Sequence, residues 1–247
     1  MAEAEKFSII IPAYNEAGNI ANTLREAIKV FKNFKDFKNS FEILVVDDGS
    51  TDNTSEIVNA FIDSSPENIS LKSYRPNRGK GYALRYGFNF ISGTYVLFLD
   101  ADLDLHPYLA VGMFNLLQKK DADAVIGSKK NRHSTINYPF IRKFLSSGYY
   151  FFIRTLFKLP VKDTQTGIKL FRYEVLKRCM DKVKVNKYAF DLELLLAING
   201  KGYKIIESPI DLRAKRRFGR IGIKDIFSVF TDTIKIFYRY YAKRFYD

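Results

Sequence analysis

Cysteine and long apolar runs are scarce in this sequence of 247 residues. The single cysteine, Cys179, excludes an internal disulfide and favours a reducing, cytoplasmic setting. No apolar segment approaches the roughly 18 residues of a membrane-spanning helix, and no basic stretch followed by an apolar one opens the chain. We therefore expect a protein that is soluble or bound to a membrane surface.

Two common phosphate-binding motifs are absent as well. The loop Gly79-Lys80-Gly81 does not have the spacing of a P-loop, G-x-x-x-x-G-K-S/T. No G-x-G-x-x-G follows the first apolar run either. The sequence therefore contains neither the mononucleotide nor the dinucleotide signature.

Charge is divided unevenly along the chain. Residues 1–128 contain 13 Lys and Arg against 17 Asp and Glu, whereas residues 129–247 contain 27 against 10. The basic half also holds aromatic clusters, at residues 149–152 and 237–241. A basic and aromatic composition suits nucleic acid, an anionic membrane surface, or a solvated face over a core.

Strand and helix patterns alternate over the first half of a chain long enough to form one α/β domain. Short apolar runs predict strands at residues 7–11, 41–46, 69–74 and 95–99. Helices are predicted at residues 17–31, from Thr51 or Asp52 to about Ile62, and at residues 81–91. This alternation predicts a parallel, doubly wound sheet with helices on both faces, whose ligands bind beyond the carboxyl ends of the strands.

Each predicted strand is followed by polar residues, at 12–16, 47–50, 75–81 and 100–104. In the last segment Asp100, Asp102 and Asp104 alternate directly after a buried strand. Carboxylate oxygens in this arrangement are suitable ligands for a divalent cation. The sequence therefore predicts a crevice where four polar strand ends meet, with a metal site among them.

These strand ends resemble the motifs of family 2 glycosyltransferases with the GT-A fold, in the segments Pro12–Glu16, Val45–Asp52, Asn77–Gly81 and Asp100–Asp102. The resemblance implies a Rossmann-like, mixed but mainly parallel sheet. It extends to about residue 213, so we expect a catalytic domain at 1–213 and a basic loop with a C-terminal amphipathic helix at 214–247.

Two later segments narrow the resemblance within the family. Asp163–Phe171 and Phe190–Glu193 are similar to the enzymes that glycosylate dolichyl or other polyprenyl phosphates, with a closer likeness to the glucosyltransferases than to the mannose synthases. The resemblance implies an inverting, Mg²⁺- or Mn²⁺-dependent transfer of a hexose from a nucleotide-diphosphate sugar. UDP-glucose is the first choice of donor and GDP-mannose the second.

Other functions remain open from the sequence. A polysaccharide or a protein is an alternative acceptor within the same family. A second class of function is a module that binds RNA or DNA without catalysis. Against it, the carboxylates at the strand ends would repel phosphates unless a metal intervened, and no RNA-recognition motif is present. We therefore expect no nucleic-acid partner.

Matching the family motifs assigns roles at the donor site. Asp100, Asp102 and Asp104 are implied as metal ligands, with Asp102 the principal catalytic carboxylate. Many mannose enzymes have Gln at the position of Asp104, and a cap on a helix at 107–117 is its alternative role. Asp47 is expected to bond backbone N–H groups within its own turn. Contacts to the nucleotide sugar are implied for Pro12, Tyr14, Glu16, Asp48, Arg75, Lys80, Asp100 and Ala101.

The acceptor site is predicted to need cations more than a base. A phosphate monoester has a second pKa of about 6 and is largely dianionic at pH 7. The resemblance places the acceptor phosphate against Lys129, Arg142, Ser146, Arg216 and Arg217, of which Lys129 and Arg142 also assist catalysis. Residues 219–222 depart from the mannose-synthase pattern of this late loop.

Asp191 and Glu193 are further acidic candidates, at the start of a helix predicted at 191–199. Asp191 either orients the acceptor or a sugar hydroxyl near the reacting centre, or stabilises the helix N-terminus together with Glu193.

Segments 139–159 and 223–246 are predicted as helices in which aromatic residues are interleaved with Lys and Arg. Lying in the membrane interface explains this composition, while packing on the sheet or on a second subunit is the alternative. We expect a peripheral protein at the cytoplasmic face of a membrane, recruited through these helices or through a membrane-protein partner.

Overall fold

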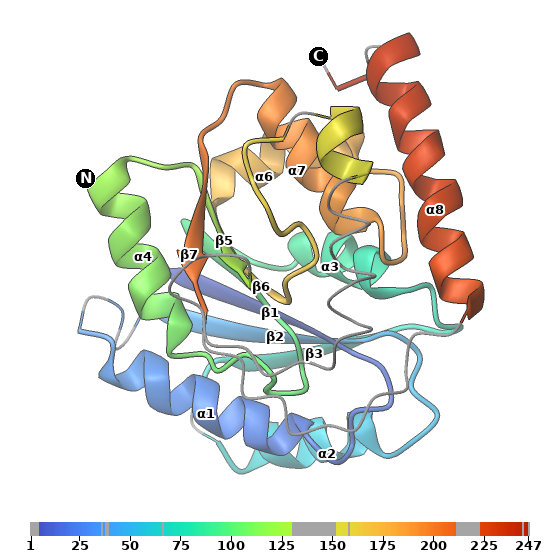
Figure 1. Ribbon diagram of the computed structural model, residues 1–247. Coiled ribbons are helices and arrows are strands. Elements are labelled where there is room, and N and C mark those ends of the chain that lie inside the picture. Colours follow the sequence, from blue (N-terminus) through green and yellow to red (C-terminus); the bar gives the residue numbers. More distant parts are fainter. Residues whose placement is uncertain are drawn as a thin grey trace.

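The computed structural model describes residues 5–35, 37, 40–65, 67–129, 152–157, 159–210, 223–243 and 245–246. Their centre is a seven-stranded sheet in the order β3-β2-β1-β4-β6-β5-β7 (Figure 1). Only β6 is antiparallel to its neighbours, β4 and β5. The strands are β1 (Phe7–Ala13), β2 (Phe41–Asp47), β3 (Ile69–Ser73), β4 (Tyr95–Leu99), β5 (Ala124–Ser128), β6 (Ile168–Arg172) and β7 (Ile205–Pro209).

Helices cover both faces of the sheet. One face carries α1 (Ile20–Asn33), α2 (Thr54–Asp63) and α4 (Leu109–Lys120). The other carries α3 (Lys80–Phe88), α6 (Tyr173–Cys179), the short η1 (Met180–Lys182) and α7 (Phe190–Gly200). Beside α7 lies α8 (Ile223–Phe237), which continues into the π-helical turn η2 (Tyr238–Ala242).

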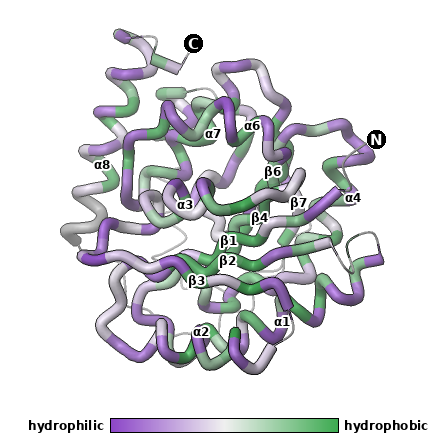
Figure 2. The backbone as a smooth tube through the Cα atoms, turned by 180° about the vertical axis from the view of Figure 1, so that it is seen from behind, coloured by the Kyte–Doolittle hydropathy of each residue, from purple (hydrophilic) through white to green (hydrophobic). Residues whose placement is uncertain are grey.

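The apolar strands explain this layering. Ile10 lies in the hydrophobic cluster beneath α3 and α7, while Ile9 and Ile11 lie in the cluster beneath α1 and α4. Because both faces are covered, the central strands are continuous apolar runs rather than alternating ones. Figure 2 shows these strands as the hydrophobic centre of the molecule.

The four predicted strands correspond to β1 through β4, and the mixed, mainly parallel sheet is confirmed. The predicted helices correspond to α1, α2, α3, α4 and α7 with ends shifted by a few residues. In α2 the carboxylate of Asp52 accepts a hydrogen bond from the Thr54 N–H at 3.1 Å, which satisfies a donor in the first turn.

The predicted C-terminal helices are confirmed in part. Of the helix predicted at 139–159, residues 152–157 are helical, whereas residues 139–151 and 158 lie outside the described residues, as does the domain boundary expected at 213–214. The second predicted helix is α8 with η2, and helical structure ends at Ala242 rather than at residue 246. Across the described ranges no helix combines the length and apolar character needed to cross a membrane.

Candidate active site

The turns that follow β1 and β2 are bonded to each other at the carboxyl edge of the sheet. The Asp48 N–H donates to the carbonyl oxygen of Ala13 at 2.8 Å, and the Asn15 N–H donates to the Ser50 hydroxyl at 3.0 Å. Glu16 is buried in this junction, whereas the ring of Tyr14 is 42% exposed. The structure therefore brings the predicted residues of the first two strand ends into one place and leaves an aromatic surface accessible beside them.

Asp47 and Asp48 make different hydrogen bonds in the turn that follows β2. Asp47 accepts hydrogen bonds from the Ser50 N–H at 2.9 Å and from the Ser55 hydroxyl, as expected for a residue that holds its own turn. Asp48 reaches across to the loop before α3, where it accepts bonds from the Arg78 N–H at 2.7 Å and the Gly79 N–H at 2.8 Å. Its carboxylate thereby fixes the entry into α3.

Gly79 occupies a position that only glycine fits. Its φ of 99° lies in a region that side chains rarely adopt, and a Cβ there would lie 2.7 Å from the Asn186 carbonyl oxygen. The loop consequently presses against residues 186–187 and directs Lys80, the first residue of α3, toward β4. Arg75 and Pro76, further back in the same loop, are exposed.

Lys80 forms an ion pair with Asp100 at the end of β4, with 2.5 Å between Nζ and Oδ1. Burial acts to lower the pKa of Lys80, but the carboxylates of Asp100 and Asp191 outweigh it, so the pKa is raised. Asp100 is also packed against Gly167, where an added Cβ would lie 2.0 Å from its Oδ2. Lys80 is therefore a charged group held at the site, and Gly167 makes room for its partner.

A second, buried ion pair lies beside the first. Lys169 on β6 is 1% exposed, and its Nζ lies 2.8 Å from Oδ1 of Asp191 in the first turn of α7. The same ammonium donates to the Thr166 carbonyl oxygen. Burial lowers the pKa of Lys169, and Asp191 opposes this shift. Asp100 and Asp191 thus each have a lysine partner.

Lys169 was not among the residues that the sequence patterns assigned to the site. It lies in a segment on which the family resemblance rests. The one sequence feature that could have indicated its role is that it is a single lysine inside the apolar run Ile168-Lys169-Leu170-Phe171. A lysine is almost never fully buried unless it is paired. A cation in a strand buried on both faces therefore predicts an acidic partner, although it does not say which one.

Glu193 is separated from the site, although it is only two residues from Asp191. It is fully buried and accepts bonds from the Arg239 guanidinium at 2.6 Å and the Tyr246 hydroxyl at 2.5 Å. The N–H groups of Lys184 and Val185 also donate to it. Glu193 thus joins α7 to the turn that follows α8, and its role is structural.

The three aspartates after β4 do not form a ready three-ligand metal site. Asp100 is held by Lys80, and Asp102 accepts a hydrogen bond from the Asp104 N–H at 3.1 Å. Within the described ranges no three acidic, histidine or cysteine side chains lie close enough together to hold a metal ion by themselves. Mg²⁺ is usually bound by one or two carboxylates together with substrate phosphates. The oxygen donors of Asp100 and Asp102 fit that mode of binding.

The roles predicted for Asp104 and Ala101, in the segment after β4, can be compared with the structure. The alternative role of Asp104 as a helix cap is wrong, because α4 begins at Leu109 with Tyr108 in the cap position and no side-chain capping bond. Ala101 is buried, and its carbonyl oxygen accepts a hydrogen bond from the Thr23 hydroxyl at 2.6 Å. This bond ties the segment to α1.

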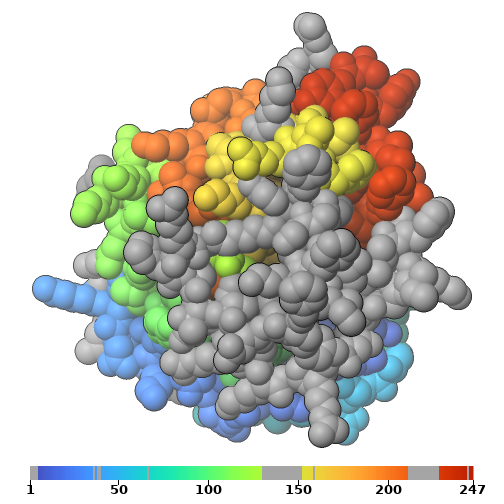
Figure 3. Space-filling view, viewed as in Figure 1, coloured from blue at the N-terminus to red at the C-terminus, as the bar shows by residue number. Residues whose placement is uncertain are grey.

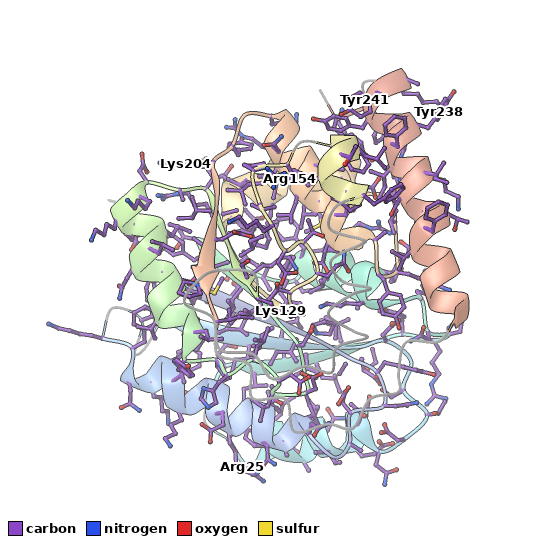
Figure 4. All side chains as sticks on the ribbon, in the orientation of Figure 1. Arg25, Lys129, Arg154, Lys204, Tyr238 and Tyr241 are labelled. Atoms are coloured by element: carbon purple, nitrogen blue, oxygen red, sulfur yellow. The ribbon has the colours of Figure 1, made fainter. Side chains whose placement is uncertain are left out.

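Lys129 is the one predicted acceptor residue within the described part of the chain. It directly follows β5, where Figure 4 labels it. Its N–H donates to Oδ2 of Asp163 at 3.0 Å. The other four, Arg142, Ser146, Arg216 and Arg217, lie outside the described residues.

Comparison with known proteins shows which family this chain belongs to. The sequence profile of Glycosyl transferase family 2 matches residues 8–180. The chain belongs to this family. Dolichyl-phosphate beta-glucosyltransferases are 36% identical over 213 residues in Dictyostelium discoideum and 33% identical over 221 residues in Saccharomyces cerevisiae. These matches cover 83% and 82% of this chain, which spans 65% of the length of each relative.

Solved structures confirm the GT-A fold of this family 2 glycosyltransferase chain. A mannosyltransferase from Pyrobaculum calidifontis in complex with GDP-Man and Mn²⁺ is 21% identical with a TM-score of 0.62, over 95% of this chain and 65% of that one. Glucosyl-3-phosphoglycerate synthase from Mycobacterium tuberculosis, in complex with Mn²⁺, UDP and its product, is 20% identical with a TM-score of 0.67, over 95% and 79% of the two chains.

Proposed function

We propose that this chain transfers a hexose from a nucleotide-diphosphate sugar to a dolichyl or related polyprenyl phosphate, with inversion at the anomeric carbon. One observation carries the proposal. The Lys80–Asp100 pair, the buried Lys169–Asp191 pair and Lys129 lie around one edge of the sheet, so carboxylates and cations are grouped where two phosphate-containing substrates would bind. The names of the relatives, dolichyl-phosphate beta-glucosyltransferases, support the same acceptor.

The donor side is built from the ends of β1, β2 and β4. The exposed ring of Tyr14 offers a stacking surface for a base, and Lys80 is positioned to meet a phosphate oxygen. Asp100 and Asp102 would hold a divalent cation, which would supply a Lewis acid for the departing nucleoside diphosphate. Glu16 and Asp48 offer acceptors to ribose or base, as the family motifs imply.

The acceptor side requires orientation rather than proton removal, because a phosphate dianion is already a nucleophile at pH 7. Lys129 is the cation that we assign to this phosphate. Asp191 shares its buried position with Lys169, whose Nζ lies 2.8 Å from Oδ1 of Asp191, so its carboxylate is already held in an ion pair. We therefore assign to Asp191 the positioning of a substrate hydroxyl.

An assay with purified protein tests this function directly. Radiolabelled UDP-glucose and GDP-mannose are each incubated with dolichyl phosphate in detergent, with Mg²⁺, with Mn²⁺ or with EDTA. We expect metal-dependent formation of a lipid-extractable β-linked glucosyl phosphate, with UDP-glucose as the better donor. Transfer only to a soluble sugar or protein acceptor would instead favour the alternative within the family.

The outer face of α8 and η2 supports attachment to a membrane surface. Phe230, Ile234, Phe237 and Tyr238 are exposed by 38% to 56%, while Ile236 on the opposite face is fully buried in the core. Figure 3 shows α8 at the periphery of the molecule. The inner face thus packs on the domain, as the alternative interpretation expected, and we propose that the outer aromatic face enters the interface of the cytoplasmic leaflet.

Replacing Phe230, Ile234 and Phe237 together by serine should weaken binding to vesicles that contain anionic lipid, because apolar burial drives interfacial attachment. Flotation through a density gradient measures the bound fraction, and we expect it to fall by about tenfold or more. Phe90→Ser is the matched control, since Phe90 is 44% exposed elsewhere on the surface. Equal flotation of the triple variant and the wild type would rule out this face as the membrane contact.

A further inference from the structure

Two adjacent residues beside the candidate site have buried polar atoms without hydrogen-bond partners among the described residues, namely Nε2 of Gln165 and the hydroxyl of Thr166. The Tyr74 hydroxyl is a different case, because burial and its interaction with Asp48 together raise the pKa of Tyr74. More than nine in ten buried polar groups in proteins are hydrogen-bonded, so each exception requires an explanation. Gln165 and Thr166 are adjacent, which makes a shared explanation natural.

The segment that carries Gln165 and Thr166 connects the two halves of the site. At its start, Asp163 accepts hydrogen bonds from the Lys129 N–H at 3.0 Å and from the Gln165 N–H at 3.2 Å. At its end, the Gly167 carbonyl oxygen accepts a bond from the Asp100 N–H at 3.2 Å. The segment therefore spans the distance between the donor carboxylate and the acceptor lysine.

Thr166 is held rigidly within this segment. It is fully buried, and its carbonyl oxygen accepts a hydrogen bond from Lys169, the partner of Asp191. Its methyl group packs against β5, since a Cβ added to Gly127 would lie 3.0 Å from Thr166 Cγ2. The carbonyl oxygen and the methyl group of Thr166 thus have contacts, and its buried hydroxyl is the polar group without a partner in the described part of the chain.

We propose that Gln165 and Thr166 bind hydroxyl groups of the hexose during its transfer. This inference rests on the proposed function, in which the sugar moves from a diphosphate near Asp100 to a phosphate near Lys129 and so passes over this segment. Sugar hydroxyls both donate and accept hydrogen bonds, which matches an amide and a hydroxyl side chain. The two residues thereby determine which hexose is accepted, whereas the charged residues of the site bind phosphates.

The substitution Thr166→Val tests the inference, because it removes the hydroxyl and preserves the shape. The variant and the wild type are compared with UDP-glucose and with its 2-, 3-, 4- and 6-deoxy analogues. We expect kcat/KM for UDP-glucose to fall by about tenfold or more, since a buried hydroxyl loses its partner. The deoxy analogue that lacks this partner should be used equally well by both proteins, while UDP should bind both with the same Kd.

Three further variants keep the test decisive. Thr166→Ser retains the hydroxyl and should retain the discrimination between sugars. Gln165→Met should change the discrimination at a different hydroxyl. Thr94→Val is the control, because the Thr94 hydroxyl donates to the Lys6 carbonyl oxygen at the amino end of β4, away from the site. This variant should treat all five donors as the wild type does.

The outcomes separate this inference from the function on which it rests. Equal losses of kcat/KM for all five donors in Thr166→Val, or no loss, would overturn the assignment to the sugar while the wild type still transfers hexose. A loss of UDP affinity in step with activity would also overturn it, because that result indicates a structural role. A wild-type protein that transfers no hexose to lipid phosphate would overturn the proposed function itself.

Discussion

Asp102→Asn should reduce hexose transfer by about a thousandfold, because the variant loses a carboxylate that we assign to the divalent cation. A cation at a departing group contributes several kcal/mol of charge stabilisation, and about 4 kcal/mol corresponds to a factor of about 10³ in rate. The measurements are kcat with saturating UDP-glucose and an Mn²⁺ titration of the residual activity. The Mn²⁺ concentration for half-maximal activity should rise in the same variant.

The fold provides the control for this result. Asp102 lies in a turn outside the core and accepts a hydrogen bond from the Asp104 N–H, which an asparagine oxygen can also accept. The thermal unfolding temperature of Asp102→Asn should therefore stay within a few degrees of the wild-type value. Normal metal-dependent turnover in this variant would remove the metal from Asp102 and contradict the proposed donor site.

Lys169→Met should destabilise the protein and inactivate it together. The substitution removes the partner of Asp191, which is 6% exposed, and leaves an uncompensated carboxylate in the interior. Breaking a buried pair in this way costs about 3–5 kcal/mol. Urea unfolding followed by circular dichroism measures the loss in the free energy of unfolding.

A second substitution separates stability from activity at this pair. In the double variant Lys169→Met with Asp191→Leu, both charges are replaced by apolar groups, which is often neutral or stabilising. We expect the free energy of unfolding to recover toward the wild-type value while transfer remains lost, because we assign to Asp191 the orientation of the substrate. A double variant that regains activity would assign to the pair a purely structural role.

The donor half of the site could be predicted from local sequence. Each strand from β1 to β4 is a short apolar run, and the polar residues follow directly, so parallel pairing alone brings Tyr14, Asp48 and Asp100 to one edge. The same logic does not reach the ion pairs across the site. Lys80 and Asp100 are 20 residues apart, and Lys169 and Asp191 are 22 apart, with no local pattern that relates them.

The sequence also did not show the direction of β6 in the sheet, or which neighbours Asp191 and Glu193 contact. β6 is apolar like its neighbours, so nothing local shows that it runs antiparallel between β4 and β5. Asp191 and Glu193 look equivalent at the start of a helix, yet α7 turns one toward Lys169 and the other toward Arg239. Successive positions on a helix face different neighbours, and only the packed structure shows which neighbours they meet.

The bonds that Glu193 makes to Arg239 and Tyr246 determine how membrane attachment can be studied. Shortening the chain to remove α8 and the residues after it also removes Arg239 and Tyr246, the two side chains that donate hydrogen bonds to the fully buried Glu193 carboxylate on α7. Such a truncation cannot separate loss of membrane binding from loss of stability. The truncated protein would lose Arg239, the counter-charge of Glu193, as well as the exposed face of α8. Helix α8 with η2 therefore carries the proposed attachment surface and also braces the helix that presents Asp191, and only point substitutions on its outer side address the first role alone.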